Sequence, residues 1–343
     1  MCEITPERIF KIMSRFIFTC QPDSIDLALA EVKKADSSLF VYKWLEAGCA
    51  VCETKLVFSE YSAALRASSP IFVRHICPAD GETTPDSLDV ISEYALQYLS
   101  EGESFSVQIR SLSGQDADSR RAAMQEICSP IEEQGYVSDK SSPQKIISVM
   151  LGETTYFGIS SPEENLSSWA GGMRRFAREE STASRAEFKL LEALELIGKE
   201  LPQKGRALDL GAAPGGWTRV LAQKGLSVVA VDPANLAPEV LSLKNVSHFK
   251  GTSQQYLLEP RGKFDIIVND MKLDIPESAR VMVECADCLS DDGFAVMTFK
   301  LKPKKWTAQI NAGLSVLEKG YEVLTIRQLF HNRSEITVIL TKK

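Results

Sequence analysis

Several features that would place this chain in a special class of protein are missing from its sequence. No apolar run is long enough to cross a bilayer. The first residues have mixed charge and lack the long apolar core and small-residue cleavage site of a secretory signal. The eight cysteines are spread from Cys2 to Cys288, unlike those of a disulfide scaffold. We therefore expect a reduced, cytoplasmic protein that does not bind membranes.

Convincing metal-binding patterns are missing too. The two C-x2-C pairs, Cys49/Cys52 and Cys285/Cys288, lie far apart in the sequence and in different expected domains. A structural zinc site needs both pairs close together, and Cys285 and Cys288 also fit one face of a helix. We therefore expect no metal.

Composition indicates a globular chain with an uneven charge distribution. The 343 residues are 44% hydrophobic and 25% charged, enough for two or three domains with ordinary cores. The net charge of −7 argues weakly against nucleic acid. However, residues 1–165 carry 14 basic and 25 acidic residues, a net charge of −11, whereas residues 166–343 carry 25 and 21, a net charge of +4. The mildly basic part could still contact RNA.

Three regions follow from the pattern of expected elements. Residues 1–60 read as a small α+β module without catalytic features. Residues 61–165 alternate as strand, helix, strand, helix, strand, strand, beginning with a strand at Pro70–Ile76. That order resembles a THUMP domain, a module associated with RNA-modifying enzymes. Residues 166–343 read as a doubly wound α/β domain.

A glycine-rich stretch at Ala207–Thr218, with the sequence ALDLGAAPGGWT, begins this last domain. A buried-looking strand ends in small residues and a helix follows, which is the layout of a ligand-binding turn. No lysine follows the glycines as in a phosphate loop, and the spacing does not fit GxGxxG. For the glycines alone, ordinary α/β packing is an equally good interpretation.

The rest of the domain predicts a doubly wound, seven-stranded sheet, which resembles the sheet of Rossmann-like methyltransferases. The last two strands are joined only by residues 331–334, too few for a parallel crossover, so they must be antiparallel. Ligands of open α/β sheets bind outside the carboxyl ends of the strands. The polar residues Asp232, Asp270, Lys300 and Glu335 are all expected at that edge.

The full sequence of the glycine-rich stretch is a more specific signal than the glycines alone. DLGAAPGGWT resembles the S-adenosyl-L-methionine loop of the FtsJ-type ribose 2′-O-methyltransferases. The resemblance implies this cofactor, with Asp232 placed for the ribose hydroxyls of its nucleoside. The implied cofactor-binding residues are Gly211, Ala212, Ala213, Pro214, Gly215, Gly216, Trp217, Asp232 and Asp270.

The same resemblance implies a catalytic tetrad. SRAEFKLLE matches the motif that carries the family's first catalytic lysine, here Lys189, while NDM, TFKLK and RSEITV supply Asp270, Lys300 and Glu335. Closest is the RlmM branch, which methylates cytidine of large-subunit ribosomal RNA and has a THUMP region before its catalytic domain. That branch implies ribosomal RNA or its precursor as partner, and a monomer is the simplest oligomeric state.

The hydroxyl of a ribose is a weak nucleophile, so a base must take its proton during attack. We expect Lys300 to be this base, with a pKa lowered by burial, by Lys189 and by the sulfonium charge. Lys250-Gly251-Thr252-Ser253 lacks the aspartate that commonly contacts adenine in this family, so that contact is not assigned.

Basic residues near aromatic ones are candidates for the RNA backbone, although a solvated surface would have the same composition. They are Arg174, Arg175, Arg178, Lys302, Lys304, Lys305 and Arg333.

Other functions stay open at this point. A transfer RNA ribose is an alternative acceptor, because THUMP domains are associated with RNA modification in general. A catalytically silent RNA-binding or ribosome-assembly factor would keep the cofactor fold but has no evident need for two lysines at its edge. Methylation of an amino group is disfavoured, since NDMKLD stands where an (N/D)PPY-like motif would be needed.

Overall fold

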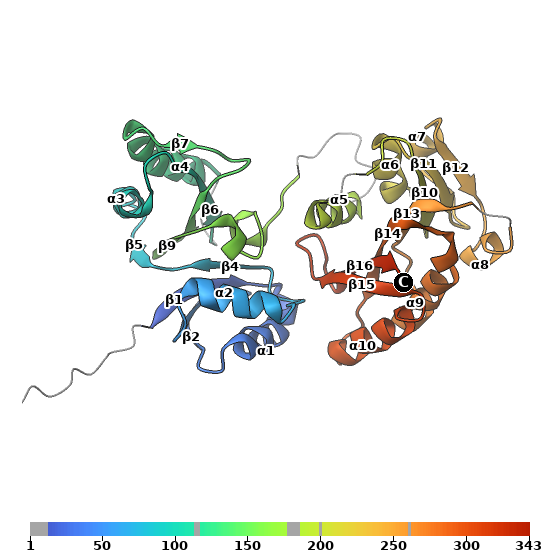
Figure 1. The fold of residues 1–343 in the computed structure, drawn as a ribbon, viewed down its shortest axis with the longest axis horizontal. Coiled ribbons are helices and arrows are strands. Elements are labelled where there is room, and N and C mark those ends of the chain that lie inside the picture. Colours follow the sequence, from blue (N-terminus) through green and yellow to red (C-terminus); the bar gives the residue numbers. More distant parts are fainter. Residues whose placement is uncertain (1–12, 113–116, 177–185, 199–200, 260–261) are drawn as a thin grey trace, which may run out of the picture. The chain divides into compact units, whose positions relative to one another are not determined.

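A computed structural model describes residues 13–112, 117–176, 186–198, 201–259 and 262–343 (Figure 1). The chain divides into two compact units, Met1–Met173 and Arg174–Lys343. Both units combine helices with sheets, so the predicted mixed α/β class is confirmed.

The first unit begins with a four-stranded antiparallel sheet in the order β2-β3-β1-β4. Two helices cover one face, because Tyr61 of α2 stacks on Phe16 of β1 with ring centroids 4.1 Å apart and donates a hydrogen bond to the Val32 carbonyl of α1. The elements are β1 (Ser14–Thr19), α1 (Ile25–Ala35), β2 (Phe40–Glu46), β3 (Cys49–Thr54), α2 (Phe58–Ala67) and β4 (His75–Pro78).

A five-stranded sheet in the order β5-β9-β8-β6-β7 completes this unit. Helices α3 and α4 pack on it through a core that includes Ile91, Phe105 and Ile127. The strands β8 and β9 form an antiparallel hairpin. The elements are β5 (Gly81–Thr83), α3 (Asp89–Tyr98), β6 (Ser104–Ser111), α4 (Ala117–Glu133), β7 (Val137–Ser138), β8 (Lys145–Leu151) and β9 (Thr155–Ser160).

The strand expected at Pro70–Ile76 begins only at His75, so this prediction is wrong for residues 70–74. The backbone N–H groups of Ile71, Phe72 and Val73 donate to the carboxylate of Glu31 on α1 at 2.8–3.2 Å. An apolar pattern does not reveal that a distant carboxylate satisfies these donors in place of a neighbouring strand.

The expected division at residues 60 and 165 stays a prediction. Residue 60 lies inside α2 (Phe58–Ala67), and β4 (His75–Pro78) pairs with β1, so the first sheet extends beyond that boundary.

The second unit contains a seven-stranded sheet in the order β12-β11-β10-β13-β14-β16-β15. The strands β10 to β14 pair in parallel, whereas β16 runs antiparallel to both of its neighbours. The strands are β10 (Arg206–Leu210), β11 (Ser227–Val231), β12 (Val246–Phe249), β13 (Phe264–Asn269), β14 (Leu289–Lys300), β15 (Tyr321–Arg327) and β16 (Glu335–Lys342).

Helices cover both faces of this sheet, as parallel strands require. On one face, α5 and α6 share a core with the strands that includes Leu190, Leu221 and Val268. On the other, α9 and α10 lie side by side (Figure 1), and a Cβ on Gly313 of α10 would lie 2.4 Å from Ile275 of α9 and 2.6 Å from Phe299 of β14. The helices are α5 (Ala186–Ile197), α6 (Gly216–Gln223), α7 (Pro238–Leu241), α8 (Ser253–Tyr256), α9 (Ile275–Glu284) and α10 (Trp306–Leu317).

Cys49 and Cys52 are both buried on β3, three positions apart, so their side chains point to opposite faces of the sheet. This spacing prevents the pair from holding one ion together. Within the described ranges, no group of three or more His, Cys, Asp or Glu residues could hold a metal. Among the helices that the structure describes, none has the length and apolar character needed to cross a membrane.

Candidate active site

The carboxyl ends of the central strands surround a cavity of about 1040 Å³ in the second unit. This size is at the upper end of the range for small-molecule sites. Loops after β10, β11, β12, β13 and β14 form its walls, together with the start of α5 and the first residue of β16. Among the predicted site residues, its lining includes Lys189, Gly211, Ala212, Ala213, Pro214, Gly216, Trp217, Asp232, Asp270, Lys300, Lys302 and Glu335.

The glycine-rich loop has its compact form because two of its residues must be glycine. Gly211 has a φ of +75°, and a Cβ there would lie 2.5 Å from Cγ of Met271. Gly215 precedes α6 with a φ of +114°, and its Cβ would lie 2.9 Å from Val240. Gly211 lines the cavity and Gly215 does not, so it is at Gly211 that the missing side chain lets a ligand approach the backbone closely.

Asp232 follows β11, the strand next to β10 in the sheet. Its Oδ2 accepts a hydrogen bond from the Ala213 backbone at 3.1 Å, and its Oδ1 accepts one from Ala234 at 2.7 Å. These bonds fix the carboxylate relative to the glycine-rich loop. An ionised carboxylate has about four acceptor positions, so two remain for ligand hydroxyls.

The four residues of the expected tetrad lie together at the edge of the cavity. Lys189 Nζ is 2.5 Å from Glu335 Oε1 and 3.4 Å from Asp270 Oδ2. Lys300 Nζ is 2.6 Å from Glu335 Oε2 and also contacts Asp270 Oδ1. Each lysine therefore touches both carboxylates, and the formal charges of the four side chains sum to zero.

This charge balance corrects the expectation that the pKa of Lys300 is lowered. Burial alone would lower the pKa of Lys300, but the charges and hydrogen bonds of Asp270 and Glu335 outweigh burial and raise it. Burial would likewise raise the pKa of Asp270, yet Lys300 and Lys189 bring it below the ordinary value. The cluster on its own thus favours a protonated Lys300 and an ionised Asp270.

The sequence interpretation missed two polar residues at the site. Thr298 of β14 donates a hydrogen bond to Asp270 Oδ1 at 2.6 Å and so helps to orient this carboxylate. Asp209 of β10 lines the cavity, is 1% exposed and accepts a hydrogen bond from the Thr218 hydroxyl at 2.6 Å. Burial raises the pKa of Asp209 to about 7. An aspartate inside an apolar strand was the available signal.

Helix α5, which carries Lys189, is anchored to α6 beside the glycine-rich loop. Trp217 Nε1 donates to the Ala186 carbonyl at 2.6 Å, and Glu187 forms a buried ion pair with Arg219 at 2.5 Å. Sequence spacing places Lys189 on a helix, whereas these contacts determine where that helix lies.

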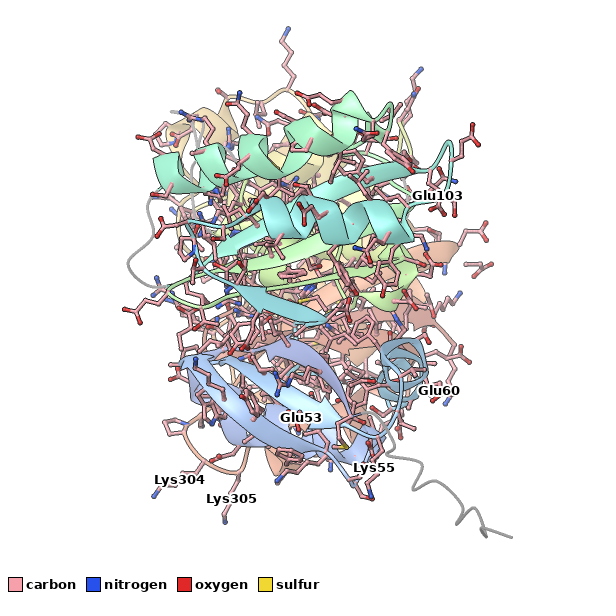
Figure 2. The ribbon with its side chains drawn as sticks, turned by 90° about the vertical axis from the view of Figure 1, so that its left-hand side faces the viewer. Glu53, Lys55, Glu60, Glu103, Lys304 and Lys305 are labelled. Carbon is pink, nitrogen blue, oxygen red and sulfur yellow. The ribbon has the colours of Figure 1, made fainter. Side chains whose placement is uncertain are left out.

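The lysines after β14 belong to a loop whose backbone is held by hydrogen bonds. Lys302 pairs with Asp274 at 2.6 Å, whereas Lys304 and Lys305 are exposed with φ values of +70° and +56°. The Gln309 side chain stabilises this conformation by binding the backbone of Lys302 and the carbonyl of Lys304. Figure 2 shows Lys304 and Lys305 extending outward from the loop.

The arginine candidates differ in their surroundings. Arg174 pairs with Glu195 at 2.7 Å and lies 4.0 Å from the Phe176 ring centroid, so internal contacts already engage it. Arg175 and Arg333 are exposed. Arg178 lies outside the described residues.

Thr252, where an adenine-binding aspartate is missing, caps α8 instead. Its hydroxyl accepts a hydrogen bond from the Gln255 backbone at 3.2 Å, and the Gln255 side chain accepts one from the Thr252 backbone at 2.8 Å. Gly251, Thr252, Ser253 and Gln254 all line the cavity.

Comparison with known proteins gives one family for this unit. Residues 182–330 match the FtsJ-like methyltransferase family. The protein named Ribosomal RNA large subunit methyltransferase M of Cellvibrio japonicus (strain Ueda107) is 31% identical over 213 residues, 58% of this chain and 59% of that one. Its namesake of Thauera aminoaromatica is 26% identical over 293 residues, 80% of this chain and 79% of that one.

Among solved structures, TrmN from Thermus thermophilus is similar over 97% of this chain and all of that chain, with 16% identity and a TM-score of 0.38.

The resemblance predicted from the sequence motifs is confirmed by the family match and by the named relatives. The matched part of the chain spans somewhat more than half the length of several relatives, 59%, 57% and 53% for three of them. The part of this chain that is similar to the FtsJ-like methyltransferase family is therefore residues 182–330.

Proposed function

We propose that the chain is an S-adenosyl-L-methionine-dependent methyltransferase that modifies a ribose 2′-hydroxyl of large-subunit ribosomal RNA. The observation that supports this proposal most directly is the cluster of Lys189, Asp270, Lys300 and Glu335 beside the glycine-rich loop. Two lysines and two carboxylates provide what a weak hydroxyl nucleophile needs, a proton acceptor and groups that orient it. The names of the relatives supply the class of RNA.

The residues around the cavity fit this cofactor. At Gly211 the cofactor can reach the backbone of the loop without obstruction by a side chain. The Asp232 carboxylate has acceptor positions left for two ribose hydroxyls. The cavity of about 1040 Å³ has room for a nucleoside with its amino acid part and for an acceptor group beside the tetrad. The adenine of the cofactor would lie near Gly251–Gln254. These residues line the cavity after β12, the strand next to β11, which Asp232 follows.

In the proposed mechanism, Lys300 accepts the proton of the 2′-hydroxyl at Nζ while Lys189 and Asp270 hold the hydroxyl in line with the methyl group. When bound, the cofactor supplies an electrophilic methyl group and a positive charge beside both lysines. A nearby positive charge lowers the pKa of a lysine, opposing the carboxylates that raise it for Lys300. Glu335 contacts both lysines and keeps them together throughout.

The remaining predictions about the whole chain belong to the same proposal. Residues 61–165 would act as a THUMP-like RNA-docking module after a small module at residues 1–60, and residues 166–343 would carry out the reaction. Lys302, Lys304, Lys305 and Arg333 would contact the RNA backbone. The protein would work as a monomer in the cytoplasm, where its RNA is found.

A labelling experiment tests the reaction and the acceptor together. Purified protein is incubated with methyl-labelled S-adenosylmethionine and RNA from cells that lack the gene, and the RNA is then hydrolysed with alkali. We expect label in alkali-resistant dinucleotides from the large-subunit size class, since 2′-O-methylation blocks cleavage at the modified ribose. Label in transfer RNA would show that transfer RNA, and not ribosomal RNA, is the acceptor. Label in single nucleotides would contradict ribose methylation. No incorporation despite cofactor binding would favour the silent assembly factor.

A further inference from the structure

Glu192 of α5, three residues after Lys189, binds the turn that leads into β16. Its Oε1 accepts a hydrogen bond from the Phe330 backbone at 2.8 Å. Its Oε2 accepts one from the His331 backbone at 3.0 Å and lies 2.9 Å from the His331 ring Nδ1. One carboxylate thus meets three nitrogen atoms of a segment 138 to 139 positions away in the chain.

The His331 ring packs against two aromatic side chains, one of them on the same helix. Its ring centroid is 5.3 Å from that of Phe188, which is one helical turn before Glu192. The Phe176 ring stacks on Phe188 with an interplanar angle of 4° and lies 5.5 Å from His331. The side chains of Glu192 and His331 are only 12% and 16% exposed. The turn is therefore held to α5 by packing as well as by hydrogen bonds.

The turn is also tied to the end of β14. The Leu301 backbone, directly after Lys300, donates to the Ser334 carbonyl at 2.9 Å. Asn332 Oδ1 accepts from the Leu329 backbone at 2.8 Å and from the Thr337 hydroxyl at 3.1 Å, which stiffens the turn itself. A rigid turn attached to α5 on one side and to β14 on the other determines where Glu335 begins β16.

From these contacts we infer that Glu192, with His331 as its partner, is a positioning residue that sets the spacing between Lys189 and Glu335. Lys189 and Glu192 are on one helix, and Glu335 follows the turn that Glu192 binds, so the two contacts join the same pair of elements. This role presupposes the methyl transfer proposed above. Glu192 itself does not line the cavity and acts only through the tetrad.

The first test compares the Glu192→Ala and Glu192→Gln variants with the unchanged chain. Glu192→Ala removes all three contacts, whereas the Glu192→Gln amide keeps one acceptor oxygen. We expect kcat to fall at least tenfold in Glu192→Ala and less in Glu192→Gln. The KM for RNA should stay within threefold of the parent value. The affinity for S-adenosylhomocysteine, measured by titration calorimetry, should also stay within threefold. Asp291→Asn is the control, because Asp291 pairs with Lys342 at the far end of β16.

The pH profile separates positioning from a general loss of folding. Glu335 is one of the two carboxylates that raise the pKa of Lys300. Because Glu335 pairs directly with Lys300 between β16 and β14, the side chain that we expect to move in Glu192→Ala is Lys189 on α5. Loss of this neighbouring positive charge raises the pKa of Lys300 further, and the rising limb of the kcat profile shifts toward higher pH. An unchanged profile, or a loss of activity that only follows a loss of cofactor binding, would overturn the role.

A crystal structure of Glu192→Ala tests the geometry whether or not the chain is active. We expect the distance from Lys189 Nζ to Glu335 Oε1 to lengthen from 2.5 Å to beyond hydrogen-bond range. An unaltered distance would overturn the positioning role even if the methyl transfer proposed for this chain holds. If the distance lengthens in Glu192→Ala but the parent chain transfers no methyl group, the proposed function is refuted and the positioning role of Glu192 is retained.

Discussion

At the scale of single residues, the surroundings of Lys300 work against its proposed role as a base. A general base must be neutral when it accepts a proton, yet Asp270 and Glu335 raise the pKa of Lys300 despite its burial. The neutral amine is therefore a minor form at pH 7, and its fraction grows as the pH rises. We accordingly expect the single-turnover rate of the parent chain to increase from pH 6 to pH 9.

Replacement of Lys300 tests the assignment of the base. We expect Lys300→Ala to lower the methyl-transfer rate by at least about 100-fold, the usual contribution of a positioned acid or base. The affinity for S-adenosylhomocysteine should change by less than about threefold, because the glycine-rich loop and Asp232 remain in place. Rates come from single-turnover labelling and affinities from calorimetry, with Lys319→Ala on the exposed surface as control. Near-normal turnover would refute the assignment.

Asp209 makes the free energy of unfolding depend on pH. Burial raises its pKa in the folded state to about 7, above its ordinary value in the unfolded chain. Between these two values the folded state binds more protons, so the stabilisation present in acid is lost as the pH rises toward 7 and beyond. A shift of this size corresponds to a few kcal/mol.

The neutral isostere Asp209→Asn should remove this dependence. We expect the variant to melt at a higher temperature than the parent at pH 8 and to show little difference at pH 5. Thermal unfolding from pH 5 to pH 8 measures the effect. Asp291→Asn is the control, because Lys342 lowers the pKa of Asp291 and this carboxylate stays ionised throughout the range. Parallel curves for parent and Asp209→Asn would contradict the prediction.

At the scale of elements, the loop between β14 and α10 presents its lysines at a cost in backbone strain. Left-handed conformations at residues other than glycine cost about 1–3 kcal/mol each, and Lys304 and Lys305 both adopt them. Gln309 stabilises the loop through its backbone contacts. Such a conformation persists where the surrounding structure enforces it, which fits a role in binding.

Neutralising these lysines tests the proposed contact with RNA. We expect a Lys304→Gln and Lys305→Gln double variant to bind RNA more weakly. The slope of log affinity against log salt should become shallower by about one to two units, because each phosphate contact releases counterions. Filter binding from 50 to 300 mM salt measures this slope, and Lys319→Gln, two residues after the end of α10, should leave it unchanged. An unaltered slope in the double variant would exclude the loop from the RNA interface.

At the scale of the whole molecule, the chain is two compact units with separate hydrophobic cores. A ligand that binds only the folded form of one unit stabilises that unit by RT ln(1 + [L]/Kd), about 2.7 kcal/mol at a concentration of 100 Kd. We expect calorimetry to resolve two unfolding transitions. S-adenosylhomocysteine at that concentration should raise one of them by about 5–10 °C and leave the other in place. A single transition that shifts as a whole would show that the units unfold together.

Much of the second unit could be predicted because its signals are local. An apolar strand is followed by glycines, beginning at Gly211, as a tight turn requires. Asp232 and Asp270 directly follow parallel strands, whose carboxyl ends must share one edge of the sheet. The short connection before Glu335 forced the last two strands to be antiparallel. These features depend on steric and hydrogen-bonding rules that act over a few residues.

The charge states and exact positions at the site were decided by the tertiary structure. The pKa of Lys300 depends on carboxylates from β16 and from the loop after β13, and that of Asp209 depends on complete burial inside the sheet. The place of Lys189 depends on α5, which Trp217, Arg219 and the turn at His331 hold from different parts of the chain. The sequence by itself determined that Asp232, Asp270, Lys300 and Glu335 lie at one edge of the sheet. Only folding determined which of them touch, because electrostatic and packing energies depend on distances between segments that the order of residues leaves open.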